Sequence, residues 1–373
     1  VTLSVVDAIE GSSGADQLVG TSGDDHIDGL KGADTVTYQG NIADYKIEMV
    51  ADGLVRVTDL KTTDGSEGSD TLNNVETIAF ADANAQVEKL FPLSGAEFLV
   101  NTTTNDSQRA PSVASLSSGG FVITWHSNGQ DGDSWGVYGQ AYAADGSLQG
   151  SEFLVNTQTA NSQRDPAVTG LSDGGFVIAW MSDRQDGDNG GIYGQRYDVN
   201  GVAAGNEFLV NTYTNNAQEA PAVVGLSDGG FVVTWHGNTD KEGGGGYGVT
   251  GQRYGADGSV QGARFLVNSS WDDNQSNAAI DSLDGGGFVV VWQSDNTDGS
   301  SWGVYGQRYG ADASSQGGEF LINTTTSSDQ REPAVAGLSG GGFVVTWQSH
   351  DQDGSGWGIY GQRYGADGVA TGN

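Results

Sequence analysis

The chain has 373 residues, and its 48 acidic residues against 15 basic ones give a formal net charge of −33. This charge excludes nucleic acid as a partner, because a nucleic-acid-binding protein must neutralise phosphates with lysine and arginine, and it makes divalent cations the natural counter-ions. The sequence has no cysteine to form a disulfide and no apolar run of the roughly 18 residues that membrane insertion needs, while its 61 glycines indicate many tight turns.

A period of nine residues runs through the start of the chain, as GSSGADQLV, GTSGDDHID and GLKGADTVT over residues 11–37. Each copy has glycine at its first and fourth positions, aspartate at its sixth (Asp16, Asp25 and Asp34) and an aliphatic residue at its eighth. Glycine turns let backbone carbonyl groups point inward, and the aspartate adds a carboxylate, so the copies offer the oxygen ligands that Ca²⁺ takes. We therefore predict a calcium site here. The alternative interpretation is a plain cluster of Gly/Asp turns.

These copies resemble the calcium-binding nonapeptide of RTX, or haemolysin-type, repeats, G-G-x-G-x-D-x-U-x. They depart from it at the second position, where Ser12, Thr21 and Leu30 replace glycine. The resemblance implies a parallel β-roll within residues 1–37, in which turns two repeats apart stack on one side.

The same resemblance implies that Asp16 and Asp34 share one Ca²⁺, whereas Asp25 faces the other side and has half a site. It also implies an extracellular protein, secreted or at the cell surface, that leaves through a type I secretion channel and folds on external Ca²⁺. No C-terminal secretion signal is visible, so we expect either a fragment, with further domains of a larger secreted protein as partners, or another export route.

Residues 38–96 are expected to form a small β region and a linker. The stretch DYKIEMVADGLVRVTDL predicts a hairpin that turns at Ala51–Gly53, and residues 68–83 add another strand. The stretch resembles the small β region that often follows RTX repeats, and we predict no catalytic residue in it.

A longer repeat begins at residue 97. Copies start near residues 97, 152, 207, 264 and 319, and each contains four strand signals and ends its second strand on a tryptophan: Trp125, Trp180, Trp235, Trp292 and Trp347. Four strands per repeat are typical of a β-propeller blade. We expect the Trp residues, with Phe121, Phe176, Phe231, Phe288 and Phe343, to pack between sheets.

The predicted fold class is therefore all-β: a short β-roll and small β region, then a five-bladed propeller over residues 97–373. A sixth EFLVN would begin at residue 374, so we expect residues 97–101 to complete the last blade by pairing near Gly358–Tyr364. The alternative is an open array that continues in a longer protein. The repeats resemble propeller lectins, including the five-bladed tachylectin type, in architecture alone.

Candidate binding residues recur in the two longer loops of each repeat. For glycan binding they are Gln108, Gln163, Gln330, Arg109, Arg164, Arg331, Trp135, Trp302 and Trp357, with the best sites expected at Trp135 with Arg109 and at Trp357 with Arg331. Weaker calcium candidates are Asp131, Asp186, Asp298 and Asp353, each followed by glycine. The alternatives are loop capping by Gln, structural lids for Trp and hairpin turns for Asp-Gly.

Near-identical loops suit several weak, equivalent sites better than one asymmetric catalytic set, because linked sites gain avidity. We therefore expect an extracellular, calcium-dependent carbohydrate-binding or adhesion module for a polysaccharide or cell-surface glycan. One alternative is a polysaccharide-degrading enzyme, a glycosidase or lyase, for which only Glu219, Asp240 and Glu242 depart from the repeat pattern. The other is a structural spacer of a large surface protein.

Overall fold

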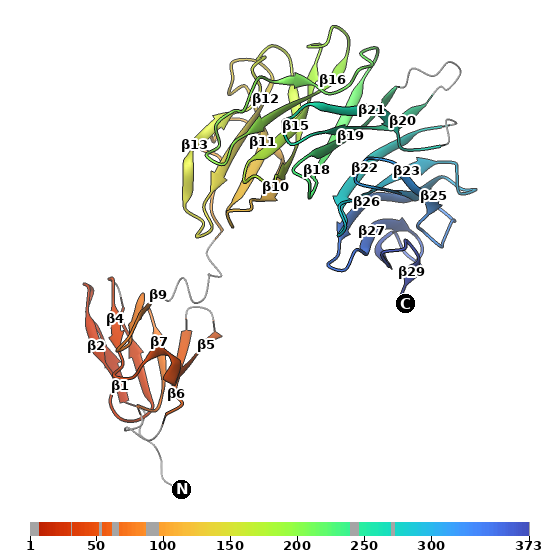
Figure 1. Ribbon diagram of the computed structural model, residues 1–373. Coiled ribbons are helices and arrows are strands. Elements are labelled where there is room, and N and C mark those ends of the chain that lie inside the picture. The colour runs from red at the N-terminus through yellow and green to blue at the C-terminus, as the bar shows by residue number, and fades with distance from the viewer. Residues whose placement is uncertain are drawn as a thin grey trace. The chain divides into compact units, whose positions relative to one another are not determined.

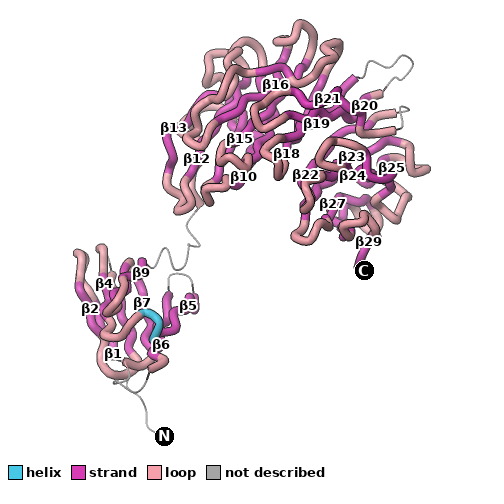
Figure 2. Tube along the Cα trace, viewed as in Figure 1, coloured by secondary structure: helices cyan, strands magenta, loops and turns pink. Residues whose placement is uncertain are grey.

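The computed structural model describes residues 7–30, 32–51, 54–61, 67–86, 97–238, 246–269 and 273–372. Strands dominate these ranges, where the only helical element is the short 3-10 helix η1 (Ile42–Asp44) (Figure 2). Nothing among these residues forms a helix long and apolar enough to cross a membrane. The chain divides into two units, Val1–Phe98 and Leu99–Asn373, and the described residues form seven sheets, two in the first unit and five in the second.

The first unit contains the parallel roll predicted from the nonapeptides (Figure 1). In one sheet, β3 (Asp25–Asp28) lies parallel between β1 (Asp7–Glu10) and β7 (Ser69–Asn73), and β6 (Leu54–Asp59) and β5 (Tyr45–Ala51) continue the sheet antiparallel. In the other, β4 (Thr35–Thr37) lies parallel between β2 (Gln17–Val19) and β8 (Thr77–Ala79), which pairs with β9 (Asn84–Gln86).

The aliphatic residue of each nonapeptide explains why these short strands pair in parallel. Ile27 lies opposite Leu72 and Val36 lies opposite Ile78 in the parallel ladders, and all four side chains are buried in one core. The predicted hairpin of residues 45–59 is confirmed. The segment that we expected to be a separate small β region shares both sheets with the nonapeptides, so the two regions form one core.

Five four-stranded antiparallel sheets make up the second unit, one for each repeat (Figure 1). In chain order their strands are β10 (Gln108–Ser115), β11 (Phe121–Asn128), β12 (Trp135–Tyr142) and β13 (Leu148–Leu154); β14 (Gln163–Gly170), β15 (Phe176–Asp183), β16 (Gly190–Tyr197) and β17 (Phe208–Leu209); β18 (Gln218–Gly225), β19 (Phe231–Asn238), β20 (Tyr247–Tyr254) and β21 (Val260–Leu266); β22 (Gln275–Ser282), β23 (Phe288–Asp295), β24 (Trp302–Tyr309) and β25 (Ser315–Leu321); and β26 (Gln330–Gly337), β27 (Phe343–His350), β28 (Trp357–Tyr364) and β29 (Ala370–Thr371).

Each sheet packs face to face on the next, with a hydrophobic core at every junction. At the first junction, Val122 and Val137 of the first sheet pack against Phe176, Ile178 and Trp180 of the second, and the other three junctions use equivalent positions. We call the face of a sheet that packs on the following sheet its trailing face, and the face that packs on the preceding sheet its leading face. The prediction that the recurrent Trp and Phe residues pack between sheets is confirmed for the last four repeats, whose Trp and Phe residues belong to the junction cores. In the first sheet, Trp125 is 4% exposed and Phe121 is partly buried, and both lie on the leading face, outside these cores.

The outer strand of each sheet crosses a glycine of the third strand. In the first sheet Phe153 pairs with Gly139, and a Cβ atom on Gly139 would lie 2.6 Å from the Phe153 ring. The glycine of the recurrent YGQ sequence therefore makes room for the phenylalanine of EFLVN.

The predicted closure of the ring by residues 97–101 is wrong. β29 occupies the edge of the last sheet, where it pairs with Arg363 and Tyr364 of β28, and residues 97–101 form no strand. Among the described residues, extensive strand contacts link each sheet to its successor, and no contact of similar extent links the first sheet to the fifth. The outer strand of the last sheet is thus supplied locally, directly after its own turn, and the sheets form an open array.

Replacing Trp180 with alanine tests the junction core. Trp180 is 0% exposed, so Trp180→Ala should lower the free energy of unfolding by about 3–5 kcal/mol. Denaturant unfolding followed by fluorescence and circular dichroism measures this loss. Leu148→Ala, at a 67% exposed position, is the control and should cost under about 0.5 kcal/mol. Equal losses in the two variants would contradict the assignment of Trp180 to the core.

Candidate functional site

The turns of the roll are stacked through one repeated contact between carboxylates and backbone N–H groups. The N–H of Asp16 donates to Asp34 Oδ1 at 2.8 Å, which brings together the two residues predicted to share an ion. The same contact joins the Asp25 N–H to Asp70 Oδ1 at 2.9 Å, and the Asp34 N–H to Glu76 Oε2 at 2.7 Å. The stack therefore extends beyond the third nonapeptide on both sides of the roll.

Asp70 belongs to a fourth nonapeptide that we missed in the sequence. Residues 65–73 read GSEGSDTLN, with glycine at positions 1 and 4, Asp70 at position 6 and Leu72 at position 8. The hairpin of β5 and β6 separates this copy from the third, so the period of nine is interrupted. Asp25 consequently has a partner carboxylate on its side of the roll, where we expected half a site.

The residue at the second position of each copy decides whether the aspartate is satisfied locally. The N–H and hydroxyl of Ser12 both donate to Asp16 Oδ2, at 2.6 and 2.9 Å, and Thr21 does the same for Asp25. The third copy has Leu30 there, which has no hydroxyl and donates its N–H to Asp28 instead.

Asp34 is therefore left with an unused oxygen. It is 0% exposed, and its Oδ2 atom has no hydrogen-bond partner. A Cβ atom on Gly29 would lie 2.6 Å from this Oδ2 and 2.2 Å from the carbonyl oxygen of Asn74. Only glycine fits at this close approach, which brings the Asp34 carboxylate and the Asn74 carbonyl near one another, and both are oxygen ligands of the kind that Ca²⁺ takes.

Burial makes the Asp70 carboxylate costly to keep charged. It raises the pKa of Asp70 to about 6, although hydrogen bonds from the Asp25 N–H and the Tyr38 hydroxyl oppose that rise. In the described parts of the chain, no three His, Asp or Glu side chains are grouped so that they alone could hold a metal ion. Backbone carbonyls would have to supply several ligands, as we expected for glycine-rich turns.

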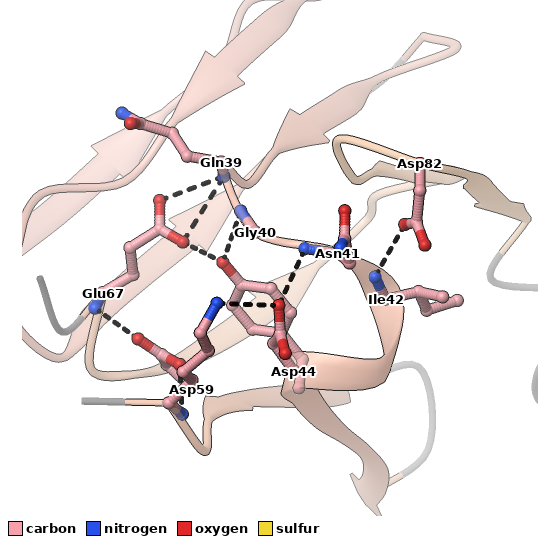
Figure 3. A network of polar contacts seen from close by, with 10 residues as sticks. Gln39, Gly40, Asn41, Ile42, Asp44, Asp59, Glu67 and Asp82 are labelled. Carbon is pink, nitrogen blue, oxygen red and sulfur yellow. Dashed lines mark hydrogen bonds and ion pairs between the residues drawn. The ribbon is translucent and has the colours of Figure 1, made fainter. Parts of the chain in front are cut away.

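A polar network fastens the inserted hairpin to the roll (Figure 3). The Tyr45 hydroxyl donates to Glu67, which belongs to the fourth nonapeptide and also accepts the Gln39 N–H at 3.2 Å. Asp59 accepts the Glu67 N–H at 3.0 Å, and Lys61 forms an ion pair with Asp44 at 3.7 Å. The network surrounds a 480 Å³ pocket, and its acidic residues are engaged in structural contacts.

In the second unit, a recurrent Asn side chain hydrogen-bonds to a backbone N–H, to an Asp and to a Gln, and we call this set of contacts the Asn clasp. Asn156 accepts the Val137 N–H at 2.7 Å, and its side-chain amide lies within 3.3 Å of Asp131 Oδ2 and of Gln163 Oε1. The same contacts recur around Asn211 with Asp186 and around Asn323 with Asp298 and Gln330. Gln163 and Gln330 are fully buried, whereas Gln108, in the first sheet, is partly exposed. Asp353 accepts the Ser355 N–H at 3.4 Å.

The Trp and Arg candidates remain near the surface. Arg109 lies 5.6 Å from the ring centre of Trp135, as expected, and His126 meets that ring edge-on at 4.7 Å. Arg331 lies 5.1 Å from the Trp302 ring of the preceding sheet, so the expected pairing of Arg331 with Trp357 is not formed.

Trp357 is 49% exposed and contacts His350, while Arg164 lies against Met181 and Asp165. Glu219 lies on β18, and Asp240 and Glu242 lie outside the described residues. A cavity of 590 Å³ lies among the first turns of the repeats, at the end of the sheets opposite to the longer loops. Its lining includes Ser115, Leu171, Asp281 and Asp284.

Comparison with known proteins identifies the first repeats. The family model for the RTX calcium-binding nonapeptide repeat, in four copies, matches residues 7–39. RTX nonapeptide repeats bind calcium, so the predicted cofactor, Ca²⁺, is confirmed. No curated protein matches the chain.

Solved structures resemble the chain in fold. A Dyadobacter fermentans protein of unknown function has a TM-score of 0.50 at 12% identity, over 71% of this chain and 81% of that one. A Streptococcus pneumoniae sialidase has a TM-score of 0.45 at 9% identity, over 85% and 75%. A Fusarium graminearum α-L-arabinofuranosidase has 0.45 at 10%, over 86% and 88%. At such identities a likeness concerns the fold alone, and the last two scores are too low to support any argument about function.

His236 at the third junction gives a pH-dependent prediction. Burial lowers the pKa of His236 from 6.5 to about 4, and its Nδ1 atom accepts the Asn277 N–H at 3.4 Å. Between pH 6.5 and about 4, His236 therefore binds a proton in the unfolded chain but not in the folded one. Stability should fall by roughly 3 kcal/mol as the pH drops from 6.5 to 4.

His236→Gln should remove this part of the pH dependence, because glutamine occupies the equivalent positions 293 and 348. Gln293 accepts the equivalent hydrogen bond, from the Glu332 N–H, at 3.0 Å. Denaturant unfolding at pH 8 and at pH 4.5 compares the variant with the wild type. The two proteins should differ little at pH 8, and an equal loss of stability at low pH would contradict the prediction.

Proposed function

We propose that this chain is an extracellular, calcium-stabilised binding module, in which the roll takes up Ca²⁺ and the sheet array binds glycan. The observation that carries the calcium part is the buried, unpartnered Oδ2 atom of Asp34 beside Gly29. The extracellular location is supported by the RTX match at residues 7–39, since such repeats are typical of secreted proteins.

The residues that would hold the ion are Asp34, with the carbonyl of Asn74, on one side of the roll, and Asp25 with Asp70 on the other. The Asp25 and Asp70 Oδ2 atoms would lie 2.9 and 3.3 Å from a Cβ atom on Gly20, so both carboxylates face one glycine. Asp16 is bound to its own Ser12 and stacks on Asp34. A bound Ca²⁺ supplies positive charge to carboxylates that burial would otherwise penalise.

Asp34→Asn tests the calcium site. The change keeps the shape of the side chain but removes its charge, so Ca²⁺ affinity should fall at least about tenfold, which corresponds to about 1.4 kcal/mol. Isothermal titration calorimetry measures this affinity. Asp257→Asn, on an exposed turn of the second unit, makes the same charge change and should leave the affinity unaltered.

Chelation provides a second readout of the same site. Hydrogen exchange in residues 7–86 should accelerate when EGTA removes Ca²⁺, while exchange in the buried strands of the second unit stays unchanged. Equal affinities of Asp34→Asn and wild type, together with unchanged exchange in residues 7–86, would show that Asp34 holds no ion.

The glycan part of the proposal rests on the Arg–Trp pairs. Arg109 with Trp135, and Arg331 with Trp302, each place a guanidinium near a partly exposed indole ring. A flat aromatic surface with adjacent hydrogen-bond donors suits a sugar ring. The repeated sheets would present these weak sites together, which favours a polymer over a single sugar. Asp131, Asp298 and Gln330 lie in the loops that carry these pairs, and each of them contacts Asn156 or Asn323.

The double variant Trp135→Ala/Trp302→Ala tests this part. Each stacking contact is worth about 0.5–1.5 kcal/mol, so the loss of two should weaken binding to a polysaccharide by roughly tenfold or more. A glycan array first finds a ligand, and affinity electrophoresis with that polymer measures the loss. Leu148→Ala, an exposed apolar residue away from both pairs, is the control. Undiminished polymer binding by the double variant would assign the two tryptophans a structural role.

A further inference from the structure

Trp135 and Trp302 occupy equivalent positions with different surroundings. An offset of 167 residues relates the first two sheets to the last two, so each position near Trp135 has one counterpart near Trp302. Both residues begin the third strand of their sheet, and both are partly exposed. Their neighbours at the first and fourth junctions can therefore be compared position by position.

The positive charge beside Trp302 is already paired with a carboxylate. The Arg331 guanidinium lies 5.1 Å from the ring centre, and its Nη2 atom lies 2.8 Å from Asp329 Oδ2. Asp295 is directly opposite Trp302 in the ladder of β23 and β24. Residues directly opposite in a ladder share one face of the sheet, so a second carboxylate lies on the face of the ring.

The acidic groups at the fourth junction are close enough to act on one another. Burial raises the pKa of Asp295, and the charges of Asp273 and Asp329 raise it further, while Arg331 opposes this rise. Three carboxylates therefore share the positive charge of one guanidinium next to Trp302. A further negative charge brought to this place would be repelled.

The surroundings of Trp135 carry fewer negative charges. Asp295 and Asp329 have uncharged counterparts there, and Ser276 has a basic one; these are Asn128, Ser162 and Arg109. Arg109 lies 5.6 Å from the centre of the Trp135 ring, is exposed, and forms no ion pair with any described residue. Its positive charge is therefore available to a ligand.

Other charged groups of the first junction do not reverse this difference. Arg164 adds a second guanidinium there, with its Nε atom 3.8 Å from Asp165. Asp133 changes in the opposite direction, since its counterpart is Ser300, and its carboxylate accepts the Asn161 N–H at 2.9 Å. Three of the four charge-changing positions thus make the first junction less negative than the fourth.

We propose that the two tryptophan sites accept different classes of sugar: the Trp302 site takes uncharged sugar units and rejects acidic ones, and the Trp135 site accepts both. This proposal rests on the glycan binding proposed above. Asp295 and Asp329 determine the specificity. The indole ring and the donors of Arg331 suit the hydroxyl groups of an uncharged sugar, whereas a carboxylate or sulfate group would meet two carboxylates of the protein.

The unpaired Arg109 gives the Trp135 site its wider acceptance. A guanidinium binds a carboxylate or sulfate group through charge-assisted hydrogen bonds, and it also donates to hydroxyl groups. A polymer that contains both acidic and uncharged units would therefore place its acidic units at the first junction and its uncharged units at the fourth.

Fluorescence quenching by ions tests the charge at each ring without a sugar. The chain has nine tryptophans, so the part due to one ring is the difference between a protein and its Trp302→Phe or Trp135→Phe variant. At constant ionic strength, and relative to uncharged acrylamide, iodide should quench Trp302 at least about twofold less than Trp135. Asp295→Asn/Asp329→Ser, which introduces the residues of the first junction, should remove this difference.

Asp312→Asn is the matched control for the loss of charge. Asp312 lies on an exposed turn of the fourth sheet, where its carboxylate accepts the Ser314 N–H. The iodide quenching of Trp302 should be the same in this variant as in the wild type. Thermal melting shows whether all variants are folded.

Affinity electrophoresis extends the test to sugars. The gels contain dextran or hydroxyethyl cellulose, or carboxymethyl dextran or carboxymethyl cellulose, which carry carboxylates on the same backbones. In a Trp135→Ala background, an uncharged polymer should bind at least about threefold more strongly than its carboxymethyl form, and Asp295→Asn/Asp329→Ser should abolish this preference. In a Trp302→Ala background both forms should bind, and Asp312→Asn should change neither result.

Two results would overturn the selectivity and leave the glycan function standing. One is equal quenching of Trp302 and Trp135 by iodide. The other is a Trp135→Ala variant that binds carboxymethyl polymers as strongly as uncharged ones. If the wild type binds no polymer, in the gels or on the glycan array, the glycan function fails, and this inference fails with it.

Discussion

The second unit depends on one constraint: its sheets are apolar on both faces, so none can bury its own surface. In β15 the side chains of Val177 and Ala179 point to one neighbour, those of Ile178 and Trp180 point to the other, and all four are fully buried. A sheet of this kind buries both of its faces only when it lies between two others, as the second, third and fourth sheets do. The strand positions recur every 55 residues, or 57 in the third repeat, so the equivalent residues of successive sheets meet in the register that this packing needs.

The roll solves a different problem, because its narrow core holds charge as well as aliphatic side chains. Ile27, Val36, Leu72 and Ile78 fill the centre, and the stacked turns beside them bury Asp25, Asp34 and Asp70. Hydrogen bonds from backbone N–H groups and from Ser12 or Thr21 satisfy part of this charge, and the proposed Ca²⁺ would neutralise the rest. The second unit therefore depends on apolar packing between sheets, whereas the roll combines an apolar core with stacked carboxylates.

Local and periodic features were predictable from the sequence. The period of nine located the roll, the hairpin of residues 45–59 followed from alternation, and the repeat from residue 97 located four strands per sheet and the core Trp residues. The rest depends on contacts between distant segments. The fourth nonapeptide was hidden because the hairpin interrupts the period, although GSEGSDTLN carries the pattern. Periodicity could not show that Arg331 contacts Trp302 across a junction or that Gln163 is buried. It also could not predict how strongly the row of sheets curves, and this curvature decides whether the first and last sheets meet.

The inserted hairpin changes the order in which the roll can form. Asp16 and Asp34 are separated by 18 residues and can stack as soon as the first three nonapeptides leave the unfolded state, whereas Asp25 must find Asp70 across 45 residues. Closing the longer loop costs more entropy and makes folding slower, unless the hairpin folds first and shortens the effective distance. The two sides of the roll should therefore fold at different times. The side that depends on the hairpin would set the rate at which the whole first unit becomes resistant to proteases.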